Sequence, residues 1–206
     1  MFLGHIALGL GARRAMPRVP LATWFVAVQF VDLLWPIFLL AGLEHVRIAP
    51  GITAFTPLEF YDYPITHSLV GGLGWGLVLA AICRAAGLRS SDAIVVGGAV
   101  LTHWILDVIS HRPDMPVLPH GPYLGLGLWN SVAATLIVEL SMFAAGIWLY
   151  ARGRQPRLSF WLLMLFLLAA YFAAAFGPPP PNPTALAWTA LTMWVLVPWF
   201  RWVERR

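Results

Sequence analysis

The sequence contains little charge, a single cysteine and no lysine. Only 11% of its 206 residues are charged, and all 13 basic residues are arginine. Because Cys83 has no second cysteine to pair with, an internal disulfide and a Cys-x-x-Cys metal or redox site are both excluded. The arginines are dispersed and form no long basic patch, so the net charge of +4 gives little support for nucleic-acid binding.

Hydrophobic residues make up 60% of the chain, and the mean hydropathy is +0.76. Such a composition is typical of a membrane protein rather than of a soluble domain. A helix needs about 20 apolar residues to span a bilayer core of roughly 30 Å. Six runs approach that length, and they are 21–43, 65–88, 92–110, 126–151, 158–177 and 184–200. The sequence therefore predicts an all-α, polytopic integral membrane protein with six transmembrane helices.

The first 12 residues, MFLGHIALGLGA, are apolar but too short to span a bilayer. A secretory signal would carry basic residues before its apolar core, whereas here the basic stretch RRAMPR follows it. We therefore expect an uncleaved N-terminal half-length helix that enters the membrane and stays there.

The arginines divide unevenly between the two sides of a six-span topology. One side receives 11 of them, which are Arg13, Arg14, Arg18, Arg84, Arg89, Arg152, Arg154, Arg157, Arg201, Arg205 and Arg206. The other side receives Arg47 and Arg112. Since cytoplasmic loops are enriched in Lys and Arg, this division predicts a multi-pass protein of the inner (cytoplasmic) membrane with both termini in the cytoplasm.

The unusual polar residues are concentrated in the first part of a single membrane domain. All six histidines lie before residue 121, together with Asp32, Asp62 and Asp107. The remainder is rich in Leu, Ala and Trp, and contains the stretch FGPPPPNP, whose prolines favour an extended external loop. We interpret residues 1–120 as the half that carries a candidate metal site and residues 121–206 as a helical scaffold.

Small residues in the second and third runs predict close helix packing. Gly72 and Gly76 have GxxxG spacing, and Gly97 is followed by Gly98 and Ala99. Residues without bulky side chains let membrane helices approach one another closely.

The segment THWILDVISHR places His103, Asp107 and His111 four residues apart, so that on a helix they lie on one stripe. Counted from the start of the third run at ~1.5 Å per residue, His103 and Asp107 lie roughly 17 and 22 Å into the membrane. Asp32 lies at a similar depth in the first run, and His67 is near the outer end of the second.

His5, in the half-length helix, reaches about 12 Å into the membrane and so approaches the same layer. Four separate segments thus bring polar groups together, and we call these residues the His/Asp cluster: His5, Asp32, His67, His103 and Asp107. A carboxylate in mid-membrane costs roughly 2.5–3.5 kcal/mol, so partners are expected for Asp32 and Asp107. Nitrogen and oxygen donors without sulfur suit Zn²⁺ or a similar divalent ion, and the cluster has enough of them for one or two ions.

A divalent ion bound by the His/Asp cluster would indicate that the protein is a hydrolase. A metal-activated water would be the nucleophile, with His103 and Asp107 as the catalytic pair, and two ions with a bridging Asp would suit a phosphoester. The depth of the cluster predicts an amphiphilic substrate, such as a phospholipid or a lipid-linked phosphate, and a site open to the extracytoplasmic side. The expected partners are therefore the bilayer and this substrate.

Other polar residues are expected near this site without being ligands. Asp62, His111 and His120 lie at the predicted outer mouth, where they bind a further ion, position a leaving group, or are solvated loop residues. His45, beside Glu44, is expected to be solvated. Glu139, in the fourth run, is expected to pair with a polar neighbour. Two tryptophans, Trp35 and Trp104, flank the cluster.

An early His, an Asp late in the first long helix, THS at the start of the second and H-x-x-x-D in the third resemble the YdjM-like family of integral-membrane metal-dependent hydrolases. The order of these residues is also similar to that of the zinc-dependent phospholipase C and fungal nuclease group. The resemblance covers about residues 1–120. It implies that the five residues of the His/Asp cluster are metal ligands, with Asp107 as the bridge.

The chain departs from the YdjM-like pattern at four positions. Leu34 and Trp35 stand where the pattern has Asp and His, and Asp62 and Pro64 stand where it has His and Gly. Two other functions therefore stay open. One is a haem-binding cytochrome with His67 and His103 as axial ligands. The other is a non-catalytic metal-handling or proton-handling protein, or an accessory subunit, with a degenerate site.

Overall fold

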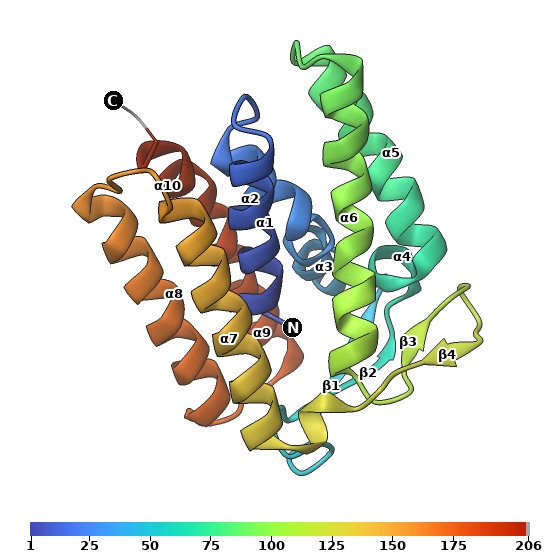
Figure 1. Ribbon diagram of the computed structural model, residues 1–206. Coiled ribbons are helices and arrows are strands. Elements are labelled where there is room, and N and C mark those ends of the chain that lie inside the picture. The colour runs from blue at the N-terminus through green and yellow to red at the C-terminus, as the bar shows by residue number, and fades with distance from the viewer. Residues whose placement is uncertain (205–206) are drawn as a thin grey trace.

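Helices make up most of the computed structural model, which describes residues 1–204 (Figure 1). The α-helices are α1 (Leu3–Ala15), α2 (Leu21–Val28), α3 (Phe30–Leu40), α4 (Pro64–His67), α5 (Leu69–Ala85), α6 (Ser90–Ser110), α7 (Val132–Ala151), α8 (Leu158–Phe176), α9 (Pro183–Leu191) and α10 (Leu196–Trp202). Short 3₁₀ turns occupy Leu128–Asn130 and Thr192–Val195. Arg205 and Arg206, two of the arginines counted above, lie outside the described residues.

Two short antiparallel hairpins interrupt the helical chain. Strand β1 (His45–Ile48) pairs with β2 (Leu58–Asp62), and β3 (Met115–Pro116) pairs with β4 (Tyr123–Leu124). Both hairpins lie in connections between predicted spans, so the predicted all-α class holds for the bulk of the chain.

The prediction of apolar spanning helices is confirmed in part. Within residues 1–204, α6, α7, α8 and the continuous run Pro183–Trp202 are long and apolar enough to cross a bilayer. Helices α2 and α3 reach that length only when they are taken together as one bent span. Helix α5 is apolar but has only 17 residues. The described chain thus contains four or five candidate membrane spans.

The first predicted span, 21–43, is not a single straight helix. It breaks at Gln29, whose φ of −113° and ψ of 9° are not helical, and α2 and α3 meet there at 54°. Pro36 lies inside α3 and does not end it. The Gln29 side chain is fully buried, and its amide nitrogen donates to Met193 Sδ at 3.4 Å. A buried polar side chain with a partner on another element therefore marks the break.

Helix α1 lies in the middle of the bundle, packed against α7 and α2 (Figure 1). Leu3, Ile6 and Leu10 on α1 are almost completely buried in the main hydrophobic core. A Cβ atom at Gly146 of α7 would lie 2.7 Å from the Cα atom of Ala7, so glycine at this place permits the contact. The predicted half-length helix is present, and protein surrounds it.

Close packing of the small residues is confirmed where α5 crosses α6. A Cβ atom at Gly97 would lie 2.4 Å from the carbonyl oxygen of Gly76, and one at Gly76 would lie 2.7 Å from that of Gly97. Gly98, the next residue, has open space around its Cα atom. The Gly76–Gly97 contact fixes the position of α6, which carries His103 and Asp107.

The two ends of the bundle differ in their connections (Figure 1). The links from α1 to α2, from α5 to α6 and from α7 to α8 lie at the upper end, together with α10. Both hairpins lie at the lower end. At the upper end Arg18 donates to both carboxylate oxygens of Asp92, at 2.8 to 3.0 Å, which joins the α1–α2 link to the start of α6.

Candidate metal centre

The structure brings all five residues of the His/Asp cluster together from four helices. His5 comes from α1, Asp32 from α3, His67 from the last residue of α4, and His103 and Asp107 from α6. Two groups of three could each hold an ion, with their ligand atoms within 4.8 Å of one another. One group is His5, His103 and Asp107, and the other is Asp32, His67 and His103. His103 is common to both groups.

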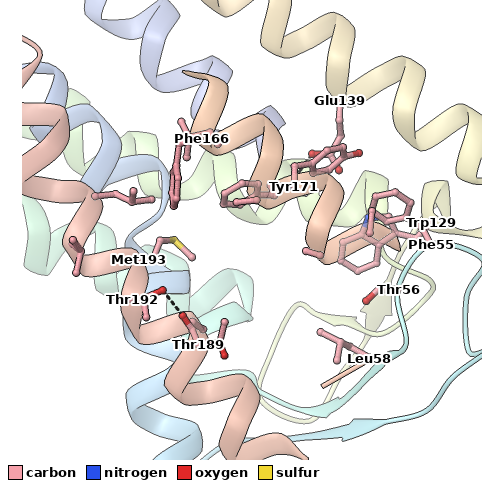
Figure 2. A pocket seen from close by; sticks show the side chains of 18 of the residues that line it. Phe55, Thr56, Leu58, Trp129, Glu139, Phe166, Tyr171, Thr189, Thr192 and Met193 are labelled. Atoms are coloured by element: carbon pink, nitrogen blue, oxygen red, sulfur yellow. Dashed lines mark hydrogen bonds between the residues drawn. The ribbon is translucent and has the colours of Figure 1, made fainter. Parts of the chain in front are cut away.

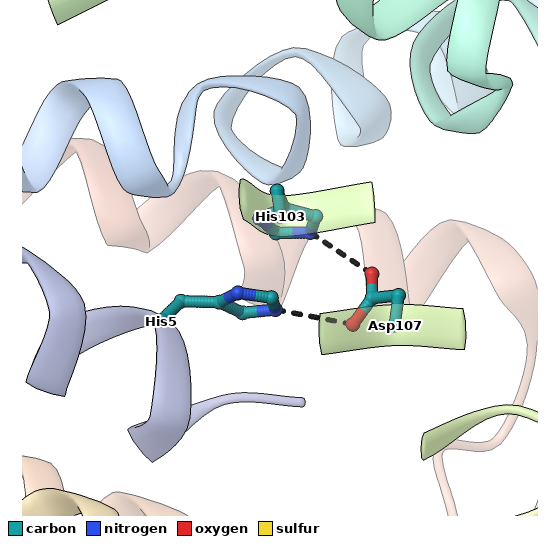
Figure 3. Close-up of side chains that lie close together, drawn as sticks. All are labelled: His5, His103 and Asp107. Carbon is teal, nitrogen blue, oxygen red and sulfur yellow. Dashed lines mark hydrogen bonds and ion pairs between the residues drawn. The ribbon is translucent and has the colours of Figure 1, made fainter. Parts of the chain in front are cut away.

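The first group lies between α1 and α6 (Figure 3). His5 Nε2 lies 3.1 Å from Asp107 Oδ1, and His103 Nε2 lies 3.1 Å from Asp107 Oδ2. The two imidazole rings are stacked, with their centroids 3.7 Å apart and an interplanar angle of 7°. Two histidines therefore meet the two oxygens of one carboxylate.

The second group extends the cluster toward α3 and α4. His67 Nε2 lies 3.2 Å from Asp32 Oδ1, and His103 Nε2 lies 3.5 Å from the same oxygen. The Asp32 side chain is 25% exposed, whereas those of His67 and His103 are buried. The cluster is therefore most open at Asp32.

The hydrogen-bond partners of His103 show that its Nδ1 carries a hydrogen. Its Nδ1 lies 2.8 Å from the carbonyl oxygen of Val28, and a carbonyl only accepts hydrogen bonds, so Nδ1 carries the hydrogen. Val28 is the last residue of α2, where helix carbonyls lack partners within the helix. His103 Nε2, which carries a lone pair when the ring is neutral, then faces Asp32 and Asp107, and within residues 1–204 this buried nitrogen has no hydrogen-bond partner.

His67 is fixed in the same tautomer by a chain of side chains. Thr66 Oγ1 lies 2.6 Å from Glu44 Oε2 and 2.7 Å from His67 Nδ1. The carboxylate of Glu44 only accepts, so the Thr66 hydroxyl donates its one proton to Glu44 and accepts from His67 Nδ1. His67 Nε2, which carries a lone pair when the ring is neutral, faces Asp32.

Glu44 is the residue of the site that the sequence did not reveal. It is only 1% exposed, and a second interaction holds it, because its Oε1 accepts from the backbone N–H of Thr66 at 2.8 Å. Glu44 lies in a short loop before the first hairpin, where no helical or strand period relates sequence position to burial. Glu44 is also 22 residues before Thr66 in the sequence, so no short-range spacing linked the two.

When both imidazoles are neutral, this arrangement sets hydrogen-bond acceptors against acceptors. The free Nε2 atoms of His67 and His103 face carboxylate oxygens across 3.1 to 3.5 Å, in an almost completely buried place. Buried anionic groups are costly unless a cation or a proton compensates them. The amino group of Met1, 2.5 Å from Asp107 Oδ1, supplies one positive charge. Positive charge is thus the chemical requirement of this cluster.

His111 is buried rather than solvated. Its side chain packs against the rings of Trp129 and Phe60, with centroids 4.3 and 4.9 Å away, and is enclosed by protein. Its Nδ1 lies 3.0 Å from Asp114 Oδ1 and 3.4 Å from the Tyr63 hydroxyl. Burial lowers the pKa of the His111 imidazole below its ordinary value, and the hydrogen bond with Asp114 opposes that shift.

The structure does not bring Asp62 and His120 into the cluster. Asp62 Oδ2 pairs with His45 Nδ1 at 2.8 Å across the first hairpin, and both side chains are about half exposed. His120 is exposed in the turn between β3 and β4. The expectation of a solvated His45 therefore holds, apart from its pairing with Asp62.

Glu139 of α7 has the polar partners expected for it, and they are backbone amides. Its Oε2 accepts from the N–H groups of Phe2, Leu3 and Gly4 at 2.9, 2.8 and 3.4 Å. Amides at the start of a helix have no partner within the helix, and the helix dipole favours an anion there. Glu139 thus fixes the beginning of α1, next to His5.

The two tryptophans lie beside the cluster as expected. The ring of Trp35 meets that of His67 edge to face, with centroids 6.2 Å apart. Trp104 Nε1 donates to the carbonyl oxygen of Pro116 at 3.0 Å, which ties α6 to β3. Pro64 occupies the first turn of α4 and starts the helix that carries His67.

Comparisons with protein-family models, with curated proteins and with solved structures gave no match to this chain. The geometry of the side chains is therefore the basis for inferring its function.

Proposed function

We propose that this chain is a membrane-embedded, metal-dependent hydrolase that cleaves a phosphoester or another ester in an amphiphilic or lipid substrate. One observation carries the proposal. His67 and His103 both have Nδ1 engaged by an acceptor, and both direct Nε2 at a carboxylate oxygen 3.1 to 3.2 Å away. Metal-binding histidines are held in this way, with one ring nitrogen donating to a fixed acceptor and the other facing the ion.

The donor set suits Zn²⁺, in one or two sites. Imidazole nitrogen and carboxylate oxygen are the usual ligands of catalytic zinc, and the two overlapping groups supply five such residues within a small volume. When bound, the ion supplies Lewis-acid activation of water and of the ester. His5, Asp32, His67, His103 and Asp107 would hold it, with His103 and Asp107 at the centre of the cluster.

The residues of this chain would also prepare the site for that chemistry. Glu44 and Thr66 keep the proton of His67 on Nδ1, so that Nε2 stays free. The carbonyl of Val28 does the same for His103. Asp32, the most exposed member, lies on the side where a substrate can approach. The aromatic rings of Trp35 and Tyr63 pack on His67 and limit the access of water.

The membrane topology belongs to the same proposal. Helix α5, at ~1.5 Å per residue, spans roughly 26 Å, and with it the chain would cross the inner membrane six times. The connections at the upper end of Figure 1 carry most of the arginines, which supports a cytoplasmic location for that end, where α1 and α10 both finish. The cluster would then open toward the extracytoplasmic side.

We also propose membership of the YdjM-like family. The motif residues that carry the resemblance, from His5 to Asp107, lie within one cluster, which supports a shared site. Haem is disfavoured by the same geometry. An oxygen of Asp32 lies within 3.5 Å of Nε2 of both His67 and His103, where the porphyrin of a bis-histidine haem would have to lie.

Hydrolysis by the purified, zinc-loaded protein in detergent tests the proposal. The substrates are a phospholipid in mixed micelles and the water-soluble bis(4-nitrophenyl) phosphate. We expect hydrolysis of the phospholipid, a loss of more than about 100-fold in His103→Ala, and a rate within about twofold of wild type in His120→Ala, whose exposed residue lies outside the cluster.

Three results would contradict the proposal in whole or in part. Equal rates in wild type and His103→Ala would show that another site, or a contaminant, catalyses the reaction. Metal bound by the cluster without hydrolysis of either substrate would assign the chain to the non-catalytic metal-handling or proton-handling class. Activity on bis(4-nitrophenyl) phosphate alone would remove the lipid substrate from the proposal.

A further inference from the structure

A groove outside the His/Asp cluster runs between α8 and the α9–α10 segment (Figure 2). Its inner part is a cavity of about 640 Å³, and an adjoining cavity of about 760 Å³ extends it toward the proline-rich link after α8. Phe55, Leu58 and Ala170 line both cavities, so the two form one groove. Most of the lining is aromatic or aliphatic. The groove therefore suits an apolar ligand of some length.

Three hydrogen-bond donors in the groove lack partners. They are Trp129 Nε1, Tyr171 Oη and Trp199 Nε1, each buried and each without an acceptor among residues 1–204. The Tyr171 side chain is only 3% exposed. Buried donors in proteins are almost always paired, with protein, with water or with a ligand. These three indicate a ligand that has acceptor atoms as well as an apolar body.

The negative charge of Glu139 limits which hydrogen-bond acceptor a ligand can place in the groove. The carboxylate of Glu139 forms part of the wall, near Tyr171 (Figure 2). A negatively charged group, such as the carboxylate of a free fatty acid, would be repelled there. A neutral ester carbonyl accepts hydrogen bonds without that repulsion. An acyl ester fits both the donors and the charge.

The groove is open on one side and close to the cluster on the other. Leu165, Phe166 and Val195, on the helices that border it, expose large apolar side chains of the kind that face lipid. At the inner end, Trp129 in the wall packs on His111, which follows α6. Phe2, also in the wall, follows Met1, whose amino group touches Asp107.

We propose that this groove binds an acyl chain of a membrane glycerolipid and that Tyr171 and Trp129 donate hydrogen bonds to its ester carbonyl. An acyl chain in the groove would leave the head group of the lipid toward the His/Asp cluster. This last step rests on the proposed hydrolase function, whereas the binding of the acyl ester does not.

Photo-crosslinking of the full chain in detergent tests the inference. The probe is phosphatidylcholine with a diazirine in one acyl chain, and mass spectrometry maps the labelled residues. We expect labelling of α8 and of Pro183–Trp202 at residues that line the groove. Ala170→Phe fills the groove and should lower this labelling at least about fivefold. The matched control is Ala169→Phe, whose exposed residue does not line the groove, and it should label as wild type does.

Competition distinguishes the ester from other amphiphiles. Unlabelled diester phosphatidylcholine should compete about fivefold better than its diether analogue, the difference expected for one lost hydrogen bond. Tyr171→Phe should reduce that preference while the protein still unfolds at a temperature close to that of wild type. Oleic acid should compete more weakly than the diester.

Three results would overturn the inference. They are labelling that Ala170→Phe leaves unchanged, equal competition by the diester and the diether in wild type, and stronger competition by oleic acid. The His103→Ala/Asp107→Ala variant separates the two proposals, because it should lose hydrolysis and keep labelling. A wild-type protein that is labelled in the groove but hydrolyses no lipid would contradict the hydrolase proposal alone.

Discussion

At the scale of single residues, the contacts behind the imidazoles matter as much as the ligand atoms. Glu44 lies outside any motif in the sequence, and Thr66 is part of the THS motif without being a predicted ligand, yet together they fix a proton on Nδ1 of His67. Hydrogen bonds of this kind orient a ligating histidine and make it more basic. The affinity of the cluster for a metal should therefore depend on the Thr66 hydroxyl.

Thr66→Val tests this dependence, because it keeps the shape of the side chain and removes the hydroxyl. We predict a loss of about 10-fold to 100-fold in zinc affinity, measured by competition with a chromophoric chelator. Thr66→Ser keeps the hydroxyl and should bind zinc nearly as wild type does. Equal zinc affinity in Thr66→Val and wild type would show that the hydrogen bonds from Glu44 through Thr66 to His67 do not affect metal binding.

The five residues of the cluster could be predicted from the sequence because charged and imidazole side chains are expensive in an apolar helix. Their spacing along the predicted helices and their estimated depth in the membrane then placed all five residues in one layer. Glu44 and the burial of His111 could not be predicted in this way, since both lie beside the hairpins, where no helical period relates sequence position to depth. The pairing of Asp62 with His45 depends on the register of the first hairpin, which the sequence did not reveal.

At the scale of helices, two contacts place the elements that carry the cluster. Glu139 binds the first amides of α1, and the Gly76–Gly97 contact sets α6 against α5. The sequence predicted close packing of the glycines and a polar partner for Glu139. It did not predict which amides Glu139 would bind, because this depends on how α1 enters the bundle beside α7.

Gly97→Ala should destabilise the fold, because its new Cβ atom would overlap the carbonyl oxygen of Gly76. We expect a loss of about 1–3 kcal/mol in the free energy of unfolding, seen as a lower melting temperature in detergent. Gly98→Ala, in the next position of the same helix, has open space and should melt as wild type does. If both variants melt alike, the close crossing of α5 and α6 is wrong.

Removal of the Glu139 carboxylate should loosen the start of α1. Glu139→Leu leaves the amides of Phe2 and Leu3 without their acceptor, at a cost of about 1–3 kcal/mol for each buried unpaired group. Since His5 follows on the same helix, zinc affinity should fall as well. Glu139→Gln keeps an acceptor oxygen and should lose less of both. An unchanged melting temperature in Glu139→Leu would contradict this role.

At the scale of the whole molecule, residues from both halves of the chain lie around the His/Asp cluster. Residues 1–120 supply the cluster, as predicted. However, α7 supplies Glu139, and Trp129 covers His111, so the second half shapes the site too. The apolar runs predicted α8 well, and α7 from Val132 onward, because a long unbroken apolar helix follows composition. The break at Gln29 was missed because it depends on a contact with Met193, far along the chain.

The proposed topology predicts which connections face the outside. In a Cys83→Ala background, single cysteines at His120→Cys and Pro179→Cys should react with a membrane-impermeant maleimide on intact cells. Gln155→Cys, in the link between α7 and α8, should react only after the membrane is opened. All three positions are exposed in the structure, so accessibility in the folded protein is not limiting. Labelling of Gln155→Cys on intact cells would contradict the proposed orientation.

The central claim is that the His/Asp cluster binds a divalent metal ion, and elemental analysis of the purified protein tests it most directly. Wild type should retain about one or two zinc ions per chain. The His103→Ala/Asp107→Ala variant should retain almost none, while an Asp62→Ala/His120→Ala variant, altered outside the cluster, should match wild type. Equal trace amounts of metal in all three proteins would contradict the account.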